Sequence, residues 1–511
     1  MPKNVIIGIH IGTTACRIAA FNDEGEILAQ NTKEYSVDYG PYGWAEQNPE
    51  CWWEAVCEIL REFFRKAMIS AEDVVAVGVD GQSWNALPVD DKGKPLRNSM
   101  TWLDRRATDE ARYLLENIGD EEISRVNSNP VDPAYIVPKI LWIKKNEQEV
   151  FKKTYKFVQS NSYIVYKLTG KFSMDRSQGY GFHFFDLNTG RWSEELSEKM
   201  GIPLEKMPDL YNSADVVGEV TQSASLATGL KKGTPVIAGG LDAATGTLGA
   251  GVLEHGQIQE QGGQAGNISV VVNKPVKNKK LILGYHVVPG CWLLQGGTVG
   301  GGSLKWFVKQ LGHLEMELSR KTGISEFKII DQEAGSVPPG SDGLIFMPYM
   351  AGERSPIWDQ NAKGVFFGLT YDKTRAHMAR AIMEGCVYAL NHNIQTVEST
   401  GINVSELVSV GGSANSYLWT QMKADITNKI IKVPISDMAS PLGSAILAGV
   451  GVGLFKDFKE AVNRVVFIKS EYHPNEELHK EYQFYYSVYM ELYENLKKSF
   501  EKISQKESAR Y

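Results

Sequence analysis

The stretch PVIAGGLDAATGTLGAG, residues 235–251, joins a short apolar run to a helix of small residues through two glycines. The run from Pro235 to Ala238 predicts a buried strand, and Asp242 then stands at the start of the predicted helix. Backbone N–H groups and the helix dipole at such an end stabilise an ionised carboxylate and also favour a bound phosphate. Taken alone, the pattern favours an Asp that only caps its helix, so the rest of the chain has to decide between a cap and a site.

The bulk properties indicate a globular protein with more than one core. A length of 511 residues favours two domains, and a formal net charge of −7 argues against nucleic acid or a membrane surface as partner. Five cysteines without a CxxC pair indicate buried thiols in a reducing compartment. The sequence shows no signal-peptide core and no apolar run of the ~20 residues that span a bilayer. We therefore expect a soluble, cytoplasmic protein.

The N-terminal segment predicts antiparallel strands joined by tight turns over residues 4–33. The first turn carries Gly12, Thr13 and Thr14, whose N–H and hydroxyl groups suit phosphate oxygens, although a purely structural hairpin is the alternative. The segment GQIQEQGGQAGNISVVVNKP, residues 256–275, repeats the order of strand, glycine turn and strand. Such a repeat indicates a duplicated domain.

A second group of candidates follows the buried run VVAVGVDG, which begins at residue 74. Ligands of open α/β sheets lie at the carboxyl ends of the strands, so the polar residues at this end are site candidates: Asp80, Gln82, Ser83, Trp84 and Asn85. The segment TWLDRRA, residues 101–107, adds Trp102 and Asp104, with a solvated, salt-bridged turn as the equal alternative.

The C-terminal half contains further glycine turns after predicted strands. Gly411 and Gly412 let the backbone approach a flat ligand closely, and Asn415 is placed to hydrogen-bond it. The stretch GLIFMPYMAGERSPIWD, residues 343–359, puts Glu353 and Arg354 after a strand. A final helix over about 474–504 is expected to pack on the second domain, with dimerisation as the alternative use.

These motifs, in this order and spacing, resemble the FGGY family of carbohydrate kinases, in the actin/hexokinase/heat-shock ATPase superfamily, over nearly the whole chain. The pattern GxxIGTT resembles the first phosphate loop of the family, and AGGLDAATGTLGAG the second phosphate region with the catalytic Asp. GERSPIWD, KGVFFGLT and RAIMEG resemble the C-terminal signature block. GGSANSYLWTQMKADI resembles the adenosine-binding turn and helix, and PLGSAILAG the second connecting helix.

The resemblance implies an α/β fold of two RNase H-like, actin-like ATPase domains that flank a central cleft. Residues 1–251 would form the sugar side with the first phosphate loop and the catalytic Asp, and residues 252–511 the nucleotide side. The implied activity is transfer of the ATP γ-phosphate to a hydroxyl of a small ketose or polyol, with a pentulose such as xylulose favoured. ATP and Mg²⁺ are the implied cofactors. Assembly into a homodimer is left open.

The resemblance also implies roles for individual residues. Asp242 matches the general base that takes the proton of the sugar hydroxyl, and it is also the implied metal ligand. The implied nucleotide-binding residues are Gly12, Thr13, Thr14, Arg17, Gly263, Gln264, Gly300, Gly411, Gly412 and Asn415. The implied sugar-binding residues are Gln82, Ser83, Trp84 as a stacking wall, Asp104 as a hydroxyl acceptor, and Asp242.

Two positions depart from the family pattern. His10 stands where the family has an Asp that helps to organise Mg²⁺, and an imidazole is a poor partner for that oxygen-seeking cation. Gln264 replaces a phosphate-facing hydroxyl. They motivate an alternative, a catalytically impaired pseudokinase that senses sugar or nucleotide. A dinucleotide-binding oxidoreductase is a more distant alternative, because the glycine runs lack the acidic residue that follows a true fingerprint.

The three residues after Gln82 narrow the choice of acceptor. Xylulokinases tend to show Met-His-Gly there, whereas this chain has Ser83, Trp84 and Asn85. The Tyr that glycerol kinases use in a later segment aligns with Ala134, which disfavours glycerol. We therefore expect a ketose or polyol of about five carbons, an expectation that rests on the resemblance.

Overall fold

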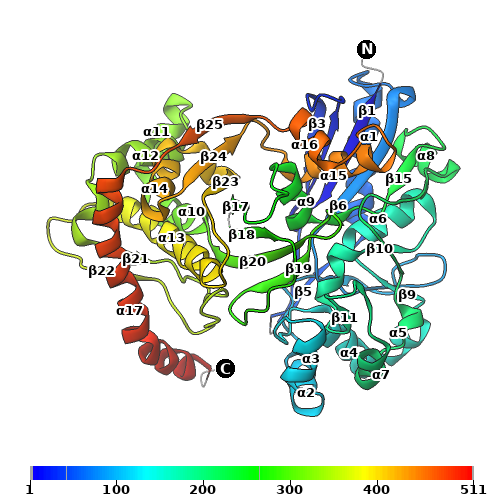
Figure 1. Cartoon of the computed structure of the whole chain (residues 1–511), viewed down its shortest axis with the longest axis horizontal. Coiled ribbons are helices and arrows are strands. Elements are labelled where there is room, and N and C mark those ends of the chain that lie inside the picture. Colours follow the sequence, from blue (N-terminus) through cyan, green and yellow to red (C-terminus); the bar gives the residue numbers. More distant parts are fainter. Residues whose placement is uncertain (1–3, 42, 264, 509–511) are drawn as a thin grey trace.

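The computed structural model describes residues 4–41, 43–263 and 265–508. Two halves, each built on a mixed β-sheet with helices packed on it, lie side by side (Figure 1). Gln264 lies outside the described residues.

The first sheet has the strand order β14-β15-β6-β1-β2-β3, with β16 paired to β6. β1, β2 and β3 form an antiparallel meander, and β6 runs parallel to β1. This confirms the strands predicted for the N-terminal segment. The bounds are β1 (Val5–Ile11), β2 (Ala15–Phe21), β3 (Ile27–Glu34), β6 (Val74–Gly81), β14 (Val216–Glu219), β15 (Pro235–Ile237) and β16 (Gly240–Leu241).

The second sheet has the order β19-β20-β18-β17-β23-β24-β25 and repeats the plan of the first. β17, β18 and β20 form an antiparallel meander, and β23 runs parallel to β17 as β6 does to β1. The duplication predicted from the glycine hairpins is therefore confirmed. The bounds are β17 (Ile258–Gly262), β18 (Ala265–Val272), β19 (Ile282–Tyr285), β20 (Trp292–Val299), β23 (Glu406–Val410), β24 (Ile430–Pro434) and β25 (Ile468–Tyr472).

The helices of the first half are α1 (Glu50–Arg65), α2 (Thr108–Asn117), α3 (Asp120–Val126), α4 (Ile136–Asn146), α5 (Gln148–Lys153), α6 (Ser160–Thr169), α7 (Glu194–Met200), α8 (Gln222–Thr228) and α9 (Asp242–Gly249). Those that come later in the chain are α10 (Gly302–Leu311), α11 (His313–Thr322), α12 (Glu326–Gly335), α13 (Arg375–Glu398), α14 (Tyr417–Thr427), α15 (Ala439–Gly451), α16 (Phe458–Val465) and α17 (Glu476–Ser508).

Short strands pair outside the two sheets. They are β4 (Asp38–Tyr39), β5 (Ala45–Gln47) and β8 (Ser99–Met100); β7 (Leu87–Val89) and β9 (Lys156–Val158); β10 (Ser173–Asp175) and β13 (Asp209–Tyr211); β11 (Phe185–Asp186) and β12 (Arg191–Trp192); β21 (Ile345–Met347) and β22 (Val365–Phe367). A 3₁₀ turn, η2 (Arg176–Gly181), follows β10.

The two faces of the first sheet are covered by helices from different parts of the chain. Successive side chains of a strand point to opposite faces. Ile7 and Ile9 accordingly pack in one buried cluster with Trp52 of α1, whereas Ile6 packs in another with Leu442 of α15. Figure 1 shows α15, in orange, beside the blue strands of the first half.

α15 approaches the first sheet at backbone distance. A methyl group added to Gly8 would lie 1.9 Å from the carbonyl oxygen of Pro441, and one added to Gly78 would lie 2.0 Å from that of Ser444. Only glycine permits such contact. Residues far beyond 251 therefore complete the hydrophobic core of the first half. A boundary at residue 251 separates the two β-sheets but does not separate the hydrophobic cores of the two halves.

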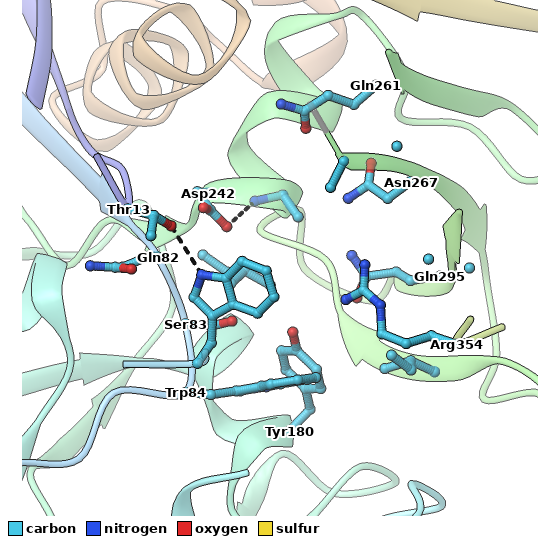
Figure 2. Close-up of a pocket in the computed structure, with 18 residues that line it drawn as sticks. Thr13, Gln82, Ser83, Trp84, Tyr180, Asp242, Gln261, Asn267, Gln295 and Arg354 are labelled. Carbon is cyan, nitrogen blue, oxygen red and sulfur yellow. Dashed lines mark hydrogen bonds between the residues drawn. The ribbon is translucent and has the colours of Figure 1, made fainter. Parts of the chain in front are cut away.

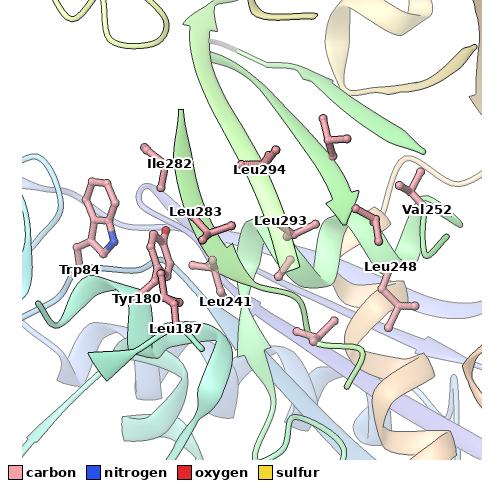
Figure 3. Close-up of a cluster of buried hydrophobic side chains, with 14 of the residues drawn as sticks. Trp84, Tyr180, Leu187, Leu241, Leu248, Val252, Ile282, Leu283, Leu293 and Leu294 are labelled. Carbon is pink, nitrogen blue, oxygen red and sulfur yellow. The ribbon is translucent and has the colours of Figure 1, made fainter. Parts of the chain in front are cut away.

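The same buried cluster runs on from one half into the other (Figure 3). Leu241 and Leu248 of the first half lie among Leu283 of β19 and Leu293 of β20. Asn129 reinforces this contact, because its side chain donates to the carbonyl of Leu283 at 2.8 Å and accepts from the N–H of the same residue at 2.9 Å. The floor between the halves is thus a packed, hydrogen-bonded contact.

The last helix, α17, packs on the second half as predicted. Its buried Tyr482 and Tyr489 lie in a cluster with Tyr388 of α13. Within the described residues, no helix combines the length and the apolar character needed to cross a membrane.

Candidate active site

A cavity of about 220 Å³ lies between the halves, above this packed floor (Figure 2). The first half supplies Thr13, Gln82, Ser83, Trp84, Trp102, Tyr180, Leu241, Asp242 and Ala243 to its lining. The second half supplies Gln261, Ala265, Gly266, Asn267, Ile282, Gln295, Gly296, Gly297 and Arg354. A small molecule held there would touch both halves at once.

Asp242 is the open carboxylate of this cavity. The two-residue strand β16 pairs with the end of β6, with Gly240 opposite Asp80, and so delivers Asp242 to the carboxyl edge of the sheet. Asp242 is the first residue of α9, and the cap position belongs to Leu241. Its Oδ1 accepts a hydrogen bond from the N–H of Ala243 at 2.7 Å. The structure therefore does not favour the interpretation of Asp242 as a mere helix cap.

The surroundings of Asp242 make it a stronger base than an ordinary Asp. Burial raises the pKa of Asp242 to about 6, and the nearby carboxylate of Asp80 adds to the rise. The charge of His10 and the N–H of Ala243 act in the opposite direction. At neutral pH the group is ionised yet more basic than a solvated Asp, which suits acceptance of a hydroxyl proton.

The cavity wall that the first half supplies, opposite the second half, is aromatic. The Trp84 ring stacks on Tyr135 with centroids 4.1 Å apart, and Tyr180 lies beside it at 5.8 Å. Trp84 has a left-handed backbone, with φ at 57°. A sugar lying in the cavity would meet a rigid apolar surface here.

Lys139 holds this wall from behind. Its Nζ donates to the carbonyl of Trp84 at 2.8 Å and to that of Thr101 at 2.5 Å, so it ties together two segments that line the cavity. Burial lowers the pKa of Lys139 to about 7, although the nearby carboxylate of Asp104 opposes this.

Asp104 is not on the cavity wall, contrary to the role expected for it. It is fully buried, and its oxygens accept from the guanidinium of Arg106 at 2.6 Å and from the N–H of Ala45 at 2.8 Å. A carboxylate with these partners has no face left for a sugar hydroxyl. Of the segment 101–107, only Trp102 reaches the cavity.

The first glycine turn lies at the edge of the cavity. The N–H of Gly12 donates to the carbonyl of Ala15 at 3.0 Å, which closes the turn. The hydroxyl oxygen of Thr13 accepts from Trp102 Nε1 at 3.0 Å and lines the cavity. Thr14 and Arg17 are exposed next to it. The geometry leaves this turn accessible to an anion.

His10 lies at the end of β1, opposite Asp80 in the parallel register. Its Nδ1 is 2.6 Å from Asp80 Oδ1, and Asp80 Oδ2 accepts from the hydroxyl of Ser444 on α15 at 2.7 Å. Both oxygens of the buried Asp80 are thus occupied by protein donors.

The glycines expected to bind nucleotide come together on the second half. The N–H of Gly301 donates to the carbonyl of Gly263 at 2.7 Å, and a methyl group on Gly411 would lie 3.1 Å from the backbone of Gly262. Gly300 lines a small cavity beside them of about 20 Å³. The exposed residues Gly412 and Asn415 begin and end the 3₁₀ turn η5 (Gly412–Asn415), whose Ser413 and Ala414 are buried. Gly411 and Gly412 are exposed at this turn, whereas Gly300 is buried.

A buried ion pair supports this region. Lys423 Nζ donates to Glu260 Oε2 and to Ser413 Oγ, each at 2.8 Å. Ser413 belongs to η5, so the pair holds the glycine turn against β17.

Several cavity residues were missed by reasoning from sequence. Tyr180 comes from a segment in which no chemistry was recognised, and Asn267 and Gln295 interrupt apolar strands. For Asn267 and Gln295, the signal in the sequence is a polar side chain within an otherwise apolar strand. The Oδ1 of Asn267 and the Oε1 of Gln82 are buried and have no hydrogen-bond partner within the described part of the chain, so both can receive a ligand donor.

The donor set suits Mg²⁺ only in part. Among described residues, no group of three or more His, Cys, Asp or Glu side chains could enclose a metal ion. Asp242 is the open carboxylate, and Mg²⁺ commonly binds one or two carboxylates together with phosphate oxygens and water. The site therefore fits a cation held mainly by a bound phosphate.

Sequence models of two family domains match this chain. The N-terminal domain of the FGGY family of carbohydrate kinases matches residues 5–249, and the C-terminal domain matches residues 269–452. The chain belongs to the FGGY family of carbohydrate kinases. The chain is therefore a carbohydrate kinase, and ATP is a substrate of such kinases. Nothing in the comparisons supports the pseudokinase alternative.

Individual FGGY kinases are similar over almost their full length. The xylulose kinase of Bacillus subtilis strain 168 is 30% identical over 496 residues, which is 96% of this chain and 97% of that protein. The gluconokinase of the same organism is 28% identical over 506 residues, with coverage of 98% and 97%. The crystal structure of a ligand-bound xylulose kinase from Lactobacillus acidophilus aligns with a TM-score of 0.89 at 26% identity, over 98% of this chain and 100% of that one.

Proposed function

We propose that this chain transfers the terminal phosphoryl group of ATP to a hydroxyl of a small ketose or polyol, with a pentulose such as xylulose as the favoured acceptor. The observation that carries the proposal is the cavity in which Asp242 faces polar side chains of the second half. The relatives named xylulose kinase support the choice of sugar.

In the proposed reaction the sugar lies between Trp84 and Asp242, with its hydroxyl groups near Gln82 and Ser83. Asp242 takes the proton of the reacting hydroxyl as its oxygen bonds to the γ-phosphorus, and the bond between that phosphorus and the ADP oxygen breaks. Such a transfer needs positioning and charge stabilisation more than covalent help from the protein.

The nucleotide is proposed to bind across the two halves. Its phosphates would meet Gly12, Thr13, Thr14 and Arg17, and its adenosine part would meet a surface made by Gly263, Gly300, Gly411, Gly412 and Asn415. Asp242 would be the protein ligand of Mg²⁺, whose charge would offset that of the phosphates. In this proposal residues 1–251 form the sugar side with the first phosphate loop and the catalytic Asp, and residues 252–511 form the nucleotide side.

The cellular setting belongs to the same proposal. All five cysteines are free thiols, which supports a reducing cytoplasm. The homodimer is kept as a proposed assembly, to be tested by the mass of the protein in solution.

A substrate panel tests the proposal. Release of ADP is measured with MgATP and each of several pentuloses, polyols and aldonates, and the phosphorylated product is identified by mass spectrometry. We expect the highest kcat/KM with a pentulose. A reaction without sugar measures background hydrolysis. Turnover with gluconate alone would move the acceptor to the aldonates, and absence of turnover with every acceptor would refute the proposal.

A further inference from the structure

The His10 imidazole is held by a neighbouring strand and, through it, by a helix that comes much later in the chain. Its Nδ1 is hydrogen-bonded to Asp80 Oδ1 at 2.6 Å. Asp80 Oδ2 in turn accepts a hydrogen bond from the hydroxyl of Ser444 on α15 at 2.7 Å. Asp80 is fully buried and His10 and Asp80 are neighbours on adjacent parallel strands. Because Nδ1 is fixed in this way, the orientation of the ring is set, and so is the direction in which Nε2 points.

The second nitrogen, Nε2, lies against the glycine turn. A methyl group built on Gly12 would stand 2.8 Å from Nε2. No hydrogen bond to Nε2 is made by any residue in the described ranges, and the side chain retains 16% of its exposure. This nitrogen is therefore free to bond a ligand that lies on the turn.

The charges around the ring favour its cationic form. Burial opposes that form, but the carboxylate of Asp80, by charge and hydrogen bond, and the charge of Asp242 outweigh burial, so the pKa of His10 is raised. Arg17 works in the same direction as burial. Because Asp80 holds the Nδ1 proton, the proton that creates the cation sits on Nε2.

We propose that His10 is a phosphate-binding residue, which donates an Nε2–H hydrogen bond to the terminal phosphate of a nucleotide lying on the turn of Gly12 to Thr14. The inference rests on the proposed function for the position of the nucleotide. A fixed protein cation at this point offsets phosphate charge without a metal, so the chain binds ATP in the absence of Mg²⁺.

Calorimetry with ATP in excess EDTA tests this inference. We expect the wild type to bind metal-free ATP, His10→Gln to bind it roughly ten-fold or more weakly because a charge-assisted hydrogen bond is lost, and His10→Asp more weakly still because a negative charge is added. Thermal unfolding of each variant checks that it is folded. The matched control is His255→Gln, since His255 is exposed, and it should bind as the wild type does.

The possible results distinguish the inference about His10 from the proposed function. Equal affinity of the wild type and His10→Gln for metal-free ATP overturns the inference, as does a wild type that binds only MgATP. Both of these results leave the proposed function standing if the substrate panel shows turnover. A wild type that binds neither form of ATP overturns both.

A measurement on the unaltered protein guards against a variant that fails to fold. Diethyl pyrocarbonate modifies the neutral form of accessible imidazoles, so a bound phosphate that covers the ring or holds its proton slows the reaction, and peptide mass spectrometry reports each histidine separately. Metal-free ATP should slow the modification of His10 several-fold and leave that of His255 unchanged. Modification of His10 at the same rate with and without ATP would count against the inference.

Discussion

At the scale of single residues, Asp242 shows how position creates a base. Its carboxylate opens to the cavity, while burial and the neighbouring Asp80 raise its pKa to about 6. The N–H of Ala243 and the start of α9 keep the ionised form available. A solvated Asp would be a weaker base, and a deeply buried one would be protonated.

Asp242→Asn is expected to lower kcat by about 10²- to 10⁴-fold, because an amide of the same shape cannot take the hydroxyl proton. Nucleotide affinity in the presence of EDTA should be retained, as measured by calorimetry. Asp209→Asn, at an exposed carboxylate, is the control and should keep full activity. Retained turnover in Asp242→Asn would refute the assignment of the base.

His286 is expected to give a pH-dependent contribution to stability. Its Nε2 bonds the carbonyl of Val252 at 3.3 Å, and its Nδ1 accepts from the N–H of Val287 at 2.8 Å, an arrangement that requires the neutral ring. Burial lowers the pKa of His286 to about 4 from its ordinary 6.5. Below 6.5 the unfolded chain binds the proton first, so this contribution falls as the pH drops towards 4.

The comparison of wild type with His286→Gln isolates this effect. Urea unfolding at several pH values should show the stability advantage of the wild type shrinking between pH 6.5 and 4, at a rate approaching about 1.4 kcal/mol per pH unit. The exposed control His255→Gln should show a difference from wild type that does not change with pH. A constant advantage over His286→Gln would contradict the prediction.

At the scale of elements, the crossing of α9 and α15 positions the base. A methyl group on Gly249 would lie 1.9 Å from the carbonyl oxygen of Ala439, and one on Gly443 would lie 1.9 Å from that of Thr245. The two helices therefore touch backbone to backbone, at a crossing that only glycine allows. Since Asp242 begins α9, this contact fixes the place of the carboxylate.

Gly443→Ala is expected to destabilise the fold by about 1–3 kcal/mol, because the added methyl forces α15 away from α9. It should also lower kcat, since α9 carries Asp242. Urea unfolding and steady-state kinetics measure both effects. Gly335→Ala is the matched control: the nearest atom to an added methyl is 3.9 Å away, so stability should hold or rise slightly and kcat should not change. Equal behaviour of the two variants would disprove the role given to the crossing.

At the scale of the whole molecule, the two halves share their cores. α15 covers one face of the first sheet, and the cluster around Leu241 and Leu283 continues through both halves. Arg354 of the second half lies 5.8 Å from the ring of Trp102 in the first, across the cavity. The halves are thus joined through a packed floor beneath the cavity.

A fragment of residues 1–251 is therefore expected not to fold alone, because the face of β1 and β6 that α15 covers would be exposed. Circular dichroism and urea unfolding of the fragment should show no cooperative transition, and co-expression with residues 252–511 should restore a folded complex. The control is the same fragment joined by a flexible linker to a segment containing α15, which should recover cooperativity. A cooperative transition in the unlinked fragment would show instead that residue 251 is an independent boundary.

The sequence by itself determined the local elements, because hydrophobic period and turn residues act over short distances. The strands that flank Gly12, the helix that begins at Asp242 and the duplicated glycine hairpin all follow from such patterns. Their order was also enough to reveal the family. Residues whose neighbours in the chain are their neighbours in space, such as Gln82 and Trp84, could be placed at the cavity.

Only the tertiary structure decided which side chains meet across long separations. Asp104 was expected to bind the sugar, yet its carboxylate oxygens accept hydrogen bonds from Arg106 and from the backbone N–H of Ala45. Tyr180 reaches the cavity from a segment in which no chemistry was recognised, and Arg354, although it follows a predicted strand, meets the first half only in the folded chain. Likewise, the His10 ring has a defined orientation only because Asp80 of a neighbouring strand bonds it, and Ser444 of a helix much later in the chain holds Asp80 in turn. Burial and pairing are properties of the packed chain, and these set the charge and orientation of the site.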